Sequence, residues 1–494
     1  MESQQRNGGE AHERGTFPGP SQGVEPGLAV LSARRCRIVQ TSDSHRLEVR
    51  TGVFDSARVR GLYVSQSDGW TYLNGGARAQ VPEKVSSAVT RAFRTAPLQA
   101  DPGAGNGTRG DAYIDAAREA VADLVGGTPE CVVLGPSRAV LLNTLAASVP
   151  AKLRMGREVV LSRVDDPVSN APWELAADLY GASLRWAEAE LTTGSLPTWQ
   201  FSELIGTSTS IVAVAAANEH IGTVTDVRAI ADLLHAKSNG WLVVDAASYA
   251  PYRYIDMAEW GADVVALDLA PLGGPEVGAL VFRDPAMLAE LRLAEVKTGR
   301  HSTPDLLSLA KRRVAALERG GLAPGLLGAV PATVDFLAGL DEDATGDRHE
   351  RLQTSLPAAE AYMHTLARHL VDGLRDFGVV HVIGVTGEDD TYGHAGSHGA
   401  AGSFGGFGSG DSSGYNSVDR VPRVSFLVPG VPASSVVERL LDNGVVAEVV
   451  GLEDSALFDQ MGVAEMGGAV CVGFAPHNTR YDVDQLVRVV GGMV

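Results

Sequence analysis

Amine groups are scarce in this sequence, and their scarcity limits any chemistry that needs an amine as a nucleophile. The chain holds 41 basic residues, of which only five are lysines and the other 36 are arginines. The lysines are Lys84, Lys152, Lys237, Lys297 and Lys311. A reaction that passes through a lysine Schiff base must therefore use one of these five side chains.

Two groups of polar residues follow short apolar runs of the kind that form buried strands. Asp245 ends the run 241–245, and open α/β sheets place their binding sites at such carboxyl ends of strands. Ser137 and Arg138 stand where a strand leads into a helix, and the first N–H groups of a helix attract anions. The two residues can therefore add donors to a phosphate site. Asp245 also fits a turn, and Ser137 also fits a plain helix N-cap.

The remaining motifs carry less weight. His364 and His369 are five apart on an expected helix, so they point about 140° away from each other, whereas zinc-binding helices place two His four apart. The GxSxG pattern at residues 410–414 lies away from any strand-to-helix turn. Cys36, Cys131 and Cys471 are scattered and form no CxxC pair. We therefore predict no metal site and no disulfide framework, and a reducing, cytoplasmic environment.

The composition excludes further classes of function. With 494 residues, 45% of them hydrophobic and 20% charged, the chain is an ordinary globular protein of more than one domain. Its net charge of −19 argues against nucleic acid or an anionic membrane as the main partner. We expect no signal peptide and no membrane-spanning helix, because neither kind of apolar run occurs.

The elements that position these residues alternate along the first two thirds of the chain. Short apolar runs at residues 130–134, 158–162, 210–216, 241–245 and 263–267 are separated by amphipathic stretches such as 173–179 and 226–237. This pattern predicts a mostly parallel sheet that is covered on both faces. Residues 278–283 follow after only a short loop, which predicts one antiparallel strand.

We divide the chain accordingly. Residues 1–28 are expected to form a disordered leader, and residues 29–327 an N-terminal segment and a large α/β domain. Residues 328–494 are expected to form a small α+β domain, with a helix at 358–377 and strands at 379–383, 423–428, 445–450 and 469–474. Within it, residues 387–419 are Gly/Ser-rich and are expected to form a flexible insertion.

The segment 218–284 resembles the class V aminotransferase family, which includes the cysteine desulfurases and selenocysteine lyases. It holds an Ile-Gly-Thr-Val turn, a Val-Asp-Ala-Ala strand end and a Gly-Ala-Asp segment. Residues 72–77, 181–182 and 478–483 resemble further motifs of that family. The resemblance implies the fold type I of pyridoxal phosphate (PLP) enzymes, PLP as cofactor, an amino acid or a phosphate-bearing molecule as ligand, and a homodimer.

The resemblance also implies roles for particular residues. Asp245 corresponds to the partner of the protonated pyridine nitrogen, and Ser137 and Arg138 to the phosphate cradle. The residue near the phenolic oxygen of the cofactor corresponds to Asn218 or, with a one-residue gap, to Glu219, and a Gln of the family corresponds to Ser248.

The lysine of the family is missing, however, because its position three residues before Gly274-Pro275 is Pro271. The fallback amine is Lys297, 26 residues farther along the chain, although a lysine there also fits the end of a helix.

Other positions depart from the family pattern as well. A Ser that helps to hold the phosphate corresponds to Asp268, the His that stacks on the cofactor ring to the region of Asp166, and the Arg that binds the substrate carboxylate to Cys471. A Thr that reaches the partner's phosphate falls at residues 320–321, and the desulfurase Cys loop falls near residues 451–454. We therefore hypothesise a degenerate site that binds a phosphate-bearing ligand or serves as a scaffold. The alternative is an active PLP transferase or lyase with a non-standard amine.

Overall fold

The computed structural model describes residues 54–95, 109–293, 305–318, 323–385, 418–451 and 455–494. The expected leader 1–28, the fallback amine Lys297, the motif at 410–414 and all but the end of the expected insertion 387–419 lie outside these residues. None of the helices within the described ranges is long and apolar enough to cross a membrane.

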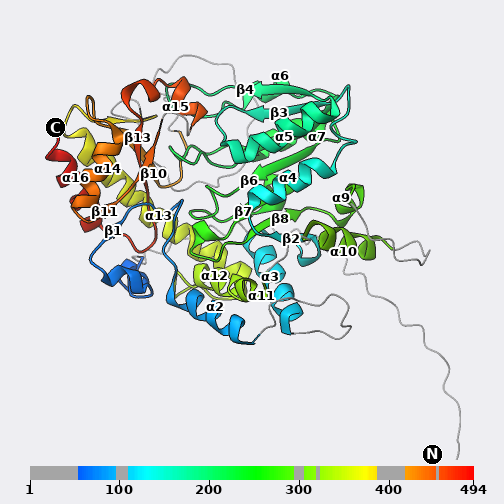
Figure 1. Ribbon diagram of the computed structural model, residues 1–494, viewed down its shortest axis with the longest axis horizontal. Helices are drawn as coiled ribbons and strands as arrows, with labels where there is room; N and C mark the ends of the chain where they lie inside the picture. The colour runs from blue at the N-terminus through cyan, green and yellow to red at the C-terminus, as the bar shows by residue number, and fades with distance from the viewer. Residues whose placement is uncertain (1–53, 96–108, 294–304, 319–322, 386–417, 452–454) are drawn as a thin grey trace, which may run out of the picture. The chain divides into compact units, whose positions relative to one another are not determined.

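A seven-stranded sheet forms the larger part of the fold (Figure 1). Its strand order is β2-β8-β7-β6-β5-β3-β4. Strand β8 is antiparallel to β2 and β7, whereas β3, β4, β5, β6 and β7 run parallel. The expected sheet with one antiparallel strand is therefore confirmed. The strands are β2 (Val132–Gly135), β3 (Glu158–Ser162), β4 (Ser183–Ala187), β5 (Thr209–Ala215), β6 (Trp241–Asp245), β7 (Val264–Asp268) and β8 (Gly278–Phe282).

Both faces of this sheet are buried, because successive residues of each strand belong to different cores. In β5, Ile211 packs in one core with Leu141 of α4 (Arg138–Ser148) and Trp173 of α5 (Pro167–Tyr180). Its neighbour Val212 belongs to the opposite core, with Ile230 of α7 (Val227–Lys237) and also with α3 (Arg109–Val125). This alternation is the physical reason why the strands read as continuous apolar runs.

A second, antiparallel sheet has the order β12-β13-β10-β9. Its strands are β9 (His381–Val382), β10 (Arg423–Leu427), β12 (Glu448–Val450) and β13 (Ala469–Gly473). The single strand expected at 445–450 is divided in two, because β11 (Val445–Val446) pairs with β1 (Thr71–Tyr72) before the chain joins β13. The domain boundary at 327/328 stays a prediction.

Helices complete the fold, and the longest of them begins ten residues before its expected start. Helix α13 (Arg348–Arg375) starts at a capping box of Asp347 and Glu350 and continues through Pro357. The others are α1 (Ser56–Arg60), η1 (Val64–Ser67), α2 (Glu83–Thr95), η2 (Pro129–Cys131), α6 (Trp199–Leu204), α8 (Met257–Trp260), η3 (Ala270–Leu272), α9 (Pro285–Glu290), α10 (Leu306–Leu317), α11 (Pro324–Leu327), α12 (Val330–Leu337), α14 (Ala433–Asp442), α15 (Ala456–Gln460), η5 (Ala464–Met466) and α16 (Arg480–Gly491).

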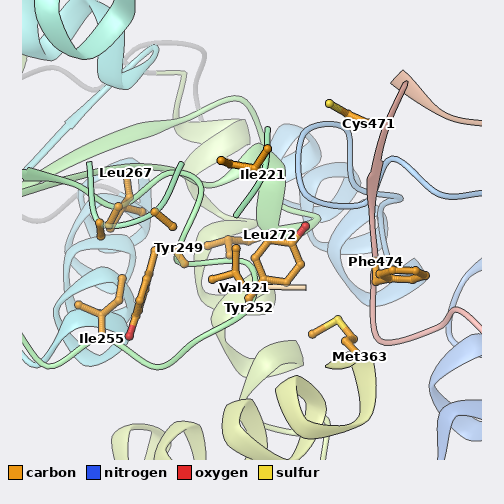
Figure 2. Packing of buried hydrophobic residues seen from close by; sticks show 14 of the residues in the cluster. Ile221, Tyr249, Tyr252, Ile255, Leu267, Leu272, Met363, Val421, Cys471 and Phe474 are labelled. Carbon is orange, nitrogen blue, oxygen red and sulfur yellow. The ribbon is translucent and has the colours of Figure 1, made fainter. Parts of the chain in front are cut away.

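The segments that follow β6 and β7 share a core with β13. Figure 2 shows Tyr252, which follows β6, Leu272 of η3 and Phe474 at the end of β13 as members of one buried cluster. All three side chains are buried. This core fixes the strand ends of the large sheet against the small one, and the candidate site lies at those strand ends.

Candidate functional site

Asp245 is the last residue of β6 and only 5% of it is exposed. One carboxylate oxygen accepts a hydrogen bond from the backbone N–H of Ala247 at 3.0 Å. The other accepts hydrogen bonds from the Ser169 hydroxyl, at 2.5 Å, and from the Arg138 guanidinium. Both oxygens of this carboxylate are therefore occupied by groups of the chain itself.

The Arg138 side chain lies among three carboxylates and is 12% exposed. Besides Asp245, its Nη2 contacts Asp166 at 2.7 Å and its Nε contacts Asp268 at 3.2 Å. Its Nη1 also donates to the Ser169 hydroxyl at 3.4 Å. Every nitrogen of the guanidinium thus faces a carboxylate, and a planar guanidinium suits such a cluster better than an ammonium group.

The N-terminus of α4 is also occupied. The Asp268 carboxylate, at the end of β7, accepts the backbone N–H of Arg138 at 2.8 Å. The Ser137 hydroxyl caps the helix by accepting the N–H of Val140 at 3.3 Å. Strand β8 passes so close that a Cβ at Gly278 would lie 2.2 Å from the Ser137 carbonyl carbon. The place where a helix attracts an anion therefore already holds a carboxylate.

Burial and the Arg138 charge act against each other on the nearby acids. Burial raises the pKa of Asp166, but the charge and hydrogen bonds of Arg138 outweigh it, so this pKa lies below its ordinary value. For Asp268 burial prevails, and its pKa is raised despite the contacts with Arg138. Burial raises the pKa of Asp165 to about 8, with the negative charges of Asp166 and Glu219 acting in the same direction. The cluster therefore sets the four carboxyl groups of Asp165, Asp166, Asp245 and Asp268 against the single positive charge of Arg138.

A small cavity with about 10 Å³ open to a water-sized molecule adjoins this cluster, and we call it the charged cavity. Arg138, Asp245, Asn218 and Ser248 all line it, so the fold brings together four of the five residues predicted to bind the cofactor. The Asn218 amide is engaged in the local turn, because it donates to the Val164 carbonyl and accepts the N–H groups of residues 220 and 221. Ser137 is not part of the lining.

Pro271 lines a different space. It belongs to η3 and borders a small cavity with about 20 Å³ open to a water-sized molecule. We call this the uncharged cavity because none of its fourteen lining residues is Asp, Glu, Lys or Arg. The four lysines within the described residues line neither cavity. Lys152 pairs with Glu290 at 3.2 Å, Lys237 donates to backbone carbonyls, and Lys84 and Lys311 are exposed.

Cys471, which stands at the position of the family's substrate-binding Arg, and the two histidines weighed as metal ligands also have partners in the fold. Cys471 is buried in β13, with its sulfur 2.7 Å from the Ser425 hydroxyl. His364 contacts Glu360, and His369 contacts Asp484. Within the described ranges, no three side chains of His, Cys, Asp or Glu are arranged to hold a metal ion.

Sequence reasoning named Asp166 only as the region of the ring-stacking His of the family, and it missed that Asp166 and Ser169 close the cluster around Arg138. Asp166 is the N-cap of α5 and accepts the N–H of Ser169 at 2.7 Å. A signal was present, because the Asp-Asp-Pro at residues 165–167, which follows the buried strand 158–162 after two residues, is typical of a helix start with proline at its first position. That signal places Asp166 at a strand end, beside Asp245 and Asp268.

Comparison with known proteins shows what this chain is similar to. A family model described as aminotransferase class V matches residues 71–359. The uncharacterized protein MT3887 of Mycobacterium tuberculosis is 40% identical over 440 residues, which cover 89% of this chain and 99% of that protein. A cysteine desulfurase of Haloferax volcanii is 24% identical, over 85% of this chain and 88% of its own length.

A solved structure gives the same result for the fold. The cysteine desulfurase CsdA of Escherichia coli matches with a TM-score of 0.69 and 21% sequence identity, over 89% of this chain and 98% of that one. With the mostly parallel sheet described above, this likeness identifies the architecture as the α/β fold type I of PLP enzymes.

Proposed function

The chain belongs to the class V aminotransferase family, and from that premise we propose that it retains the fold of the family without its Schiff-base chemistry. Members of this family use PLP as cofactor. The observation that carries the proposal is the ion pair of Arg138 with Asp245, the residue that corresponds to the partner of the pyridine nitrogen. We propose a non-catalytic, homodimeric protein of the cytoplasm that acts through binding partners.

PLP needs three things from a protein of this fold: an acid for the ring nitrogen, a cradle for the phosphate and an amine for the aldehyde. Here the acid is paired with Arg138, and the N-terminus of α4 is paired with Asp268. The position of the amine is Pro271, which lines the uncharged cavity instead. We infer that the residues present do not fit the cofactor.

The electrostatics support the same inference. A phosphate group at the start of α4 would meet the Asp268 carboxylate, and like charges at that distance repel. A pyridinium at Asp245 would have to displace a guanidinium that serves two further carboxylates. Of the two roles that the sequence leaves open, the geometry therefore favours a scaffold over a protein that binds a phosphate-bearing ligand.

The experiment is to incubate the purified protein with PLP, record the visible absorption of lysine-bound PLP, reduce with borohydride and map the peptides. We expect no visible band and no reduced adduct on any of the five lysines. An adduct on Lys297 together with turnover of an amino acid would overturn the proposal. That outcome would favour the alternative, an active PLP transferase or lyase with a non-standard amine.

A variant designed to gain PLP binding tests the observation on which the proposal rests, the ion pair of Arg138 with Asp245. In the double variant Arg138→Ala with Asp268→Ser, both the guanidinium and the competing carboxylate are absent. We expect this variant to bind PLP reversibly in equilibrium dialysis, whereas the wild type does not. The matched control is Arg163→Ala, which removes a guanidinium that is 40% exposed and 3.9 Å from Glu188. If the wild type and the double variant bind PLP equally, Arg138 does not close the site.

The homodimer is proposed because sites of this family form between subunits. Multi-angle light scattering measures the mass directly, and a mass of one chain at micromolar concentration would contradict the proposal.

Fractionation of the host cell, with the protein recovered in the membrane or the medium, would contradict the cytoplasmic location.

A further inference from the structure

The outer side of α5 carries leucines where a surface helix usually carries polar residues. Leu175 and Leu179 are 67% and 69% exposed. They are four residues apart, so they lie one above the other along the same side of the helix. Helix α7, which packs on the opposite face of the sheet, follows the usual pattern, because its exposed Arg228 and Asp232 pair at 3.0 Å. Packing against the sheet therefore does not account for the two leucines of α5.

Helix α4 runs beside α5 in the same direction and widens this apolar surface. At their starts, Arg138 contacts Asp166, the N-cap of α5, at 2.7 Å. At their ends, the Tyr180 hydroxyl donates to the carbonyl of Ala147 at 3.1 Å. We call the exposed side of these two helices the α4–α5 face. The exposed residues that α4 contributes to it are all uncharged, namely Val140, Asn143 and Ala147.

Two carboxylates lie beside the leucines. Glu174 and Asp178 each precede one of the leucines, and both are exposed. Within the described part of the chain, neither carboxylate has a hydrogen-bond or ion-pair partner. Two like charges four residues apart destabilise a helix. The α4–α5 face therefore combines exposed apolar side chains with uncompensated negative charge, and one kind of partner would relieve both.

We propose that the α4–α5 face is a docking surface for a basic amphipathic helix of another protein. The two leucines have the spacing of an apolar stripe on a partner helix, so the two stripes can pack along their length. Lysine or arginine side chains beside the partner's stripe would pair with Glu174 and Asp178. Exposed apolar surfaces rimmed by polar residues mark protein contacts in other proteins.

Charge complementarity favours a basic partner over a second copy of this chain. Each copy has a net charge of −19. A symmetric contact through α5 would bring the two carboxylates of both copies together, and like charges at an interface weaken it. A basic helix neutralises them instead. The proposal thus names the kind of partner for the scaffold role proposed above, and it rests on that role.

The probe is a fluorescein-labelled synthetic peptide in which leucine and lysine are ordered to form an amphipathic helix. A peptide of the same length with glutamate in place of lysine is its matched comparator. Fluorescence anisotropy with the full-length protein should show saturable binding of the Leu–Lys peptide, weakened by added salt. The Leu–Glu peptide should not bind, because its charges repel the carboxylates of α5.

A charge reversal separates the α4–α5 face from the rest of an acidic surface. Glu174→Lys with Asp178→Lys should weaken binding of the Leu–Lys peptide about tenfold and allow the Leu–Glu peptide to bind. The matched control is Glu438→Lys with Asp442→Lys, which changes two exposed carboxylates with the same spacing on α14. The control should change neither affinity.

A second pair of substitutions tests the leucines. Leu175→Gln with Leu179→Gln should weaken binding of the Leu–Lys peptide about tenfold, because the apolar anchors are lost. Leu441→Gln, at a leucine of α14 that is 47% exposed, should leave the affinity unchanged. All these positions are exposed, so the melting temperatures should stay close to that of the wild type.

The proposal is overturned if the α5 and α14 charge variants lose the Leu–Lys peptide equally, because binding would then follow net charge alone. It is also overturned if the Leu–Lys peptide does not bind the wild type. A mass that falls from two chains to one in Leu175→Gln with Leu179→Gln would then identify a second copy as the occupant. The PLP experiments report on Asp245 and the lysines, so their failure and the failure of this proposal are distinguishable.

Discussion

The charged and the uncharged cavity lie on the same stretch of chain, since Asp245 and Ser248 line the first and Pro251 lines the second. The polar side chains that line the two cavities differ in whether they have partners. In the charged cavity the Arg138 guanidinium contacts three carboxylates. In the uncharged cavity both nitrogens of His477 lack a partner among the described residues.

The two cavities differ in the free-energy cost of engaging their polar groups. Buried charges that already pair with one another must be separated before a ligand can bind them, and that separation is costly. A buried neutral group without a partner gains from any ligand that pairs with it. The carboxylate of Asp245 is therefore already paired within the chain, whereas the His477 ring has no hydrogen-bond partner among the described residues.

The largest expected effect comes from removing the cation of the charged cavity. Arg138→Met keeps much of the side-chain volume but leaves Asp166, Asp245 and Asp268 facing one another. We expect a loss of about 3–5 kcal/mol of unfolding free energy at pH 7, because unpaired buried charges are strongly destabilising. Urea unfolding followed by circular dichroism measures this loss.

Two measurements sharpen this prediction. Arg163→Ala, whose pair with Glu188 is partly exposed, should cost at most about 1 kcal/mol. The deficit of Arg138→Met should shrink as the pH falls toward 4, because protonation removes the charges that the variant leaves unpaired. A deficit under 1 kcal/mol at neutral pH would show that the three carboxylates do not depend on Arg138.

A second prediction concerns Asp165, whose pKa burial raises to about 8. An acid with a raised folded-state pKa contributes stability below its unfolded pKa of 3.8 and loses it as the pH rises through about 8. Asp165→Asn removes this dependence and can still accept the N–H of Ala215. Relative to the wild type, the variant should gain about 2–3 kcal/mol between pH 5 and pH 7. Parallel unfolding curves at the two pH values test it, and an unchanged difference would contradict it.

Much of the fold could be predicted because its signals are local. Apolar runs such as that of β5 are continuous because both faces of the sheet are covered, and β8 follows β7 after a loop too short for a crossover. The start of α13 was missed because Pro357 separates the expected helix from its first ten residues, although a proline inside a helix usually ends it. The capping box at Asp347 was the better signal.

The candidate site could be predicted only in part, because its decisive contacts join distant residues. The location of Asp245 at a strand end follows from the apolar run before it. Its pairing with Arg138, 107 residues away, does not, since the guanidinium reaches it through the side-chain conformation and not through the sequence pattern. No sequence signal indicated that the His477 nitrogens would lack partners among the described residues, because a lack of partners is a property of the folded packing.

The uncharged cavity should give the opposite dependence on pH. His477 has a folded-state pKa of about 3, below the ordinary 6.5. A base with a lowered pKa contributes stability above its unfolded pKa and loses it as the pH falls toward the folded pKa. Wild-type stability should therefore fall by about 2 kcal/mol more than that of His477→Phe between pH 7 and pH 5. Identical acid profiles for the two proteins would contradict a buried neutral ring.

The smallest expected effect separates a helix cap from an anion site at the start of α4. Ser137→Ala should cost about 1 kcal/mol of unfolding free energy, and Ser137→Gly only a few tenths, because the hydroxyl caps the N–H of Val140. Inorganic phosphate should leave the melting temperature of all three proteins unchanged, because Asp268 already accepts the Arg138 N–H. If phosphate stabilises the wild type but not Ser137→Ala, the serine binds anions and the start of α4 is open. The start of α4 beside the charged cavity would then also be open to an anion. The two cavities would differ only in the charge of their lining residues.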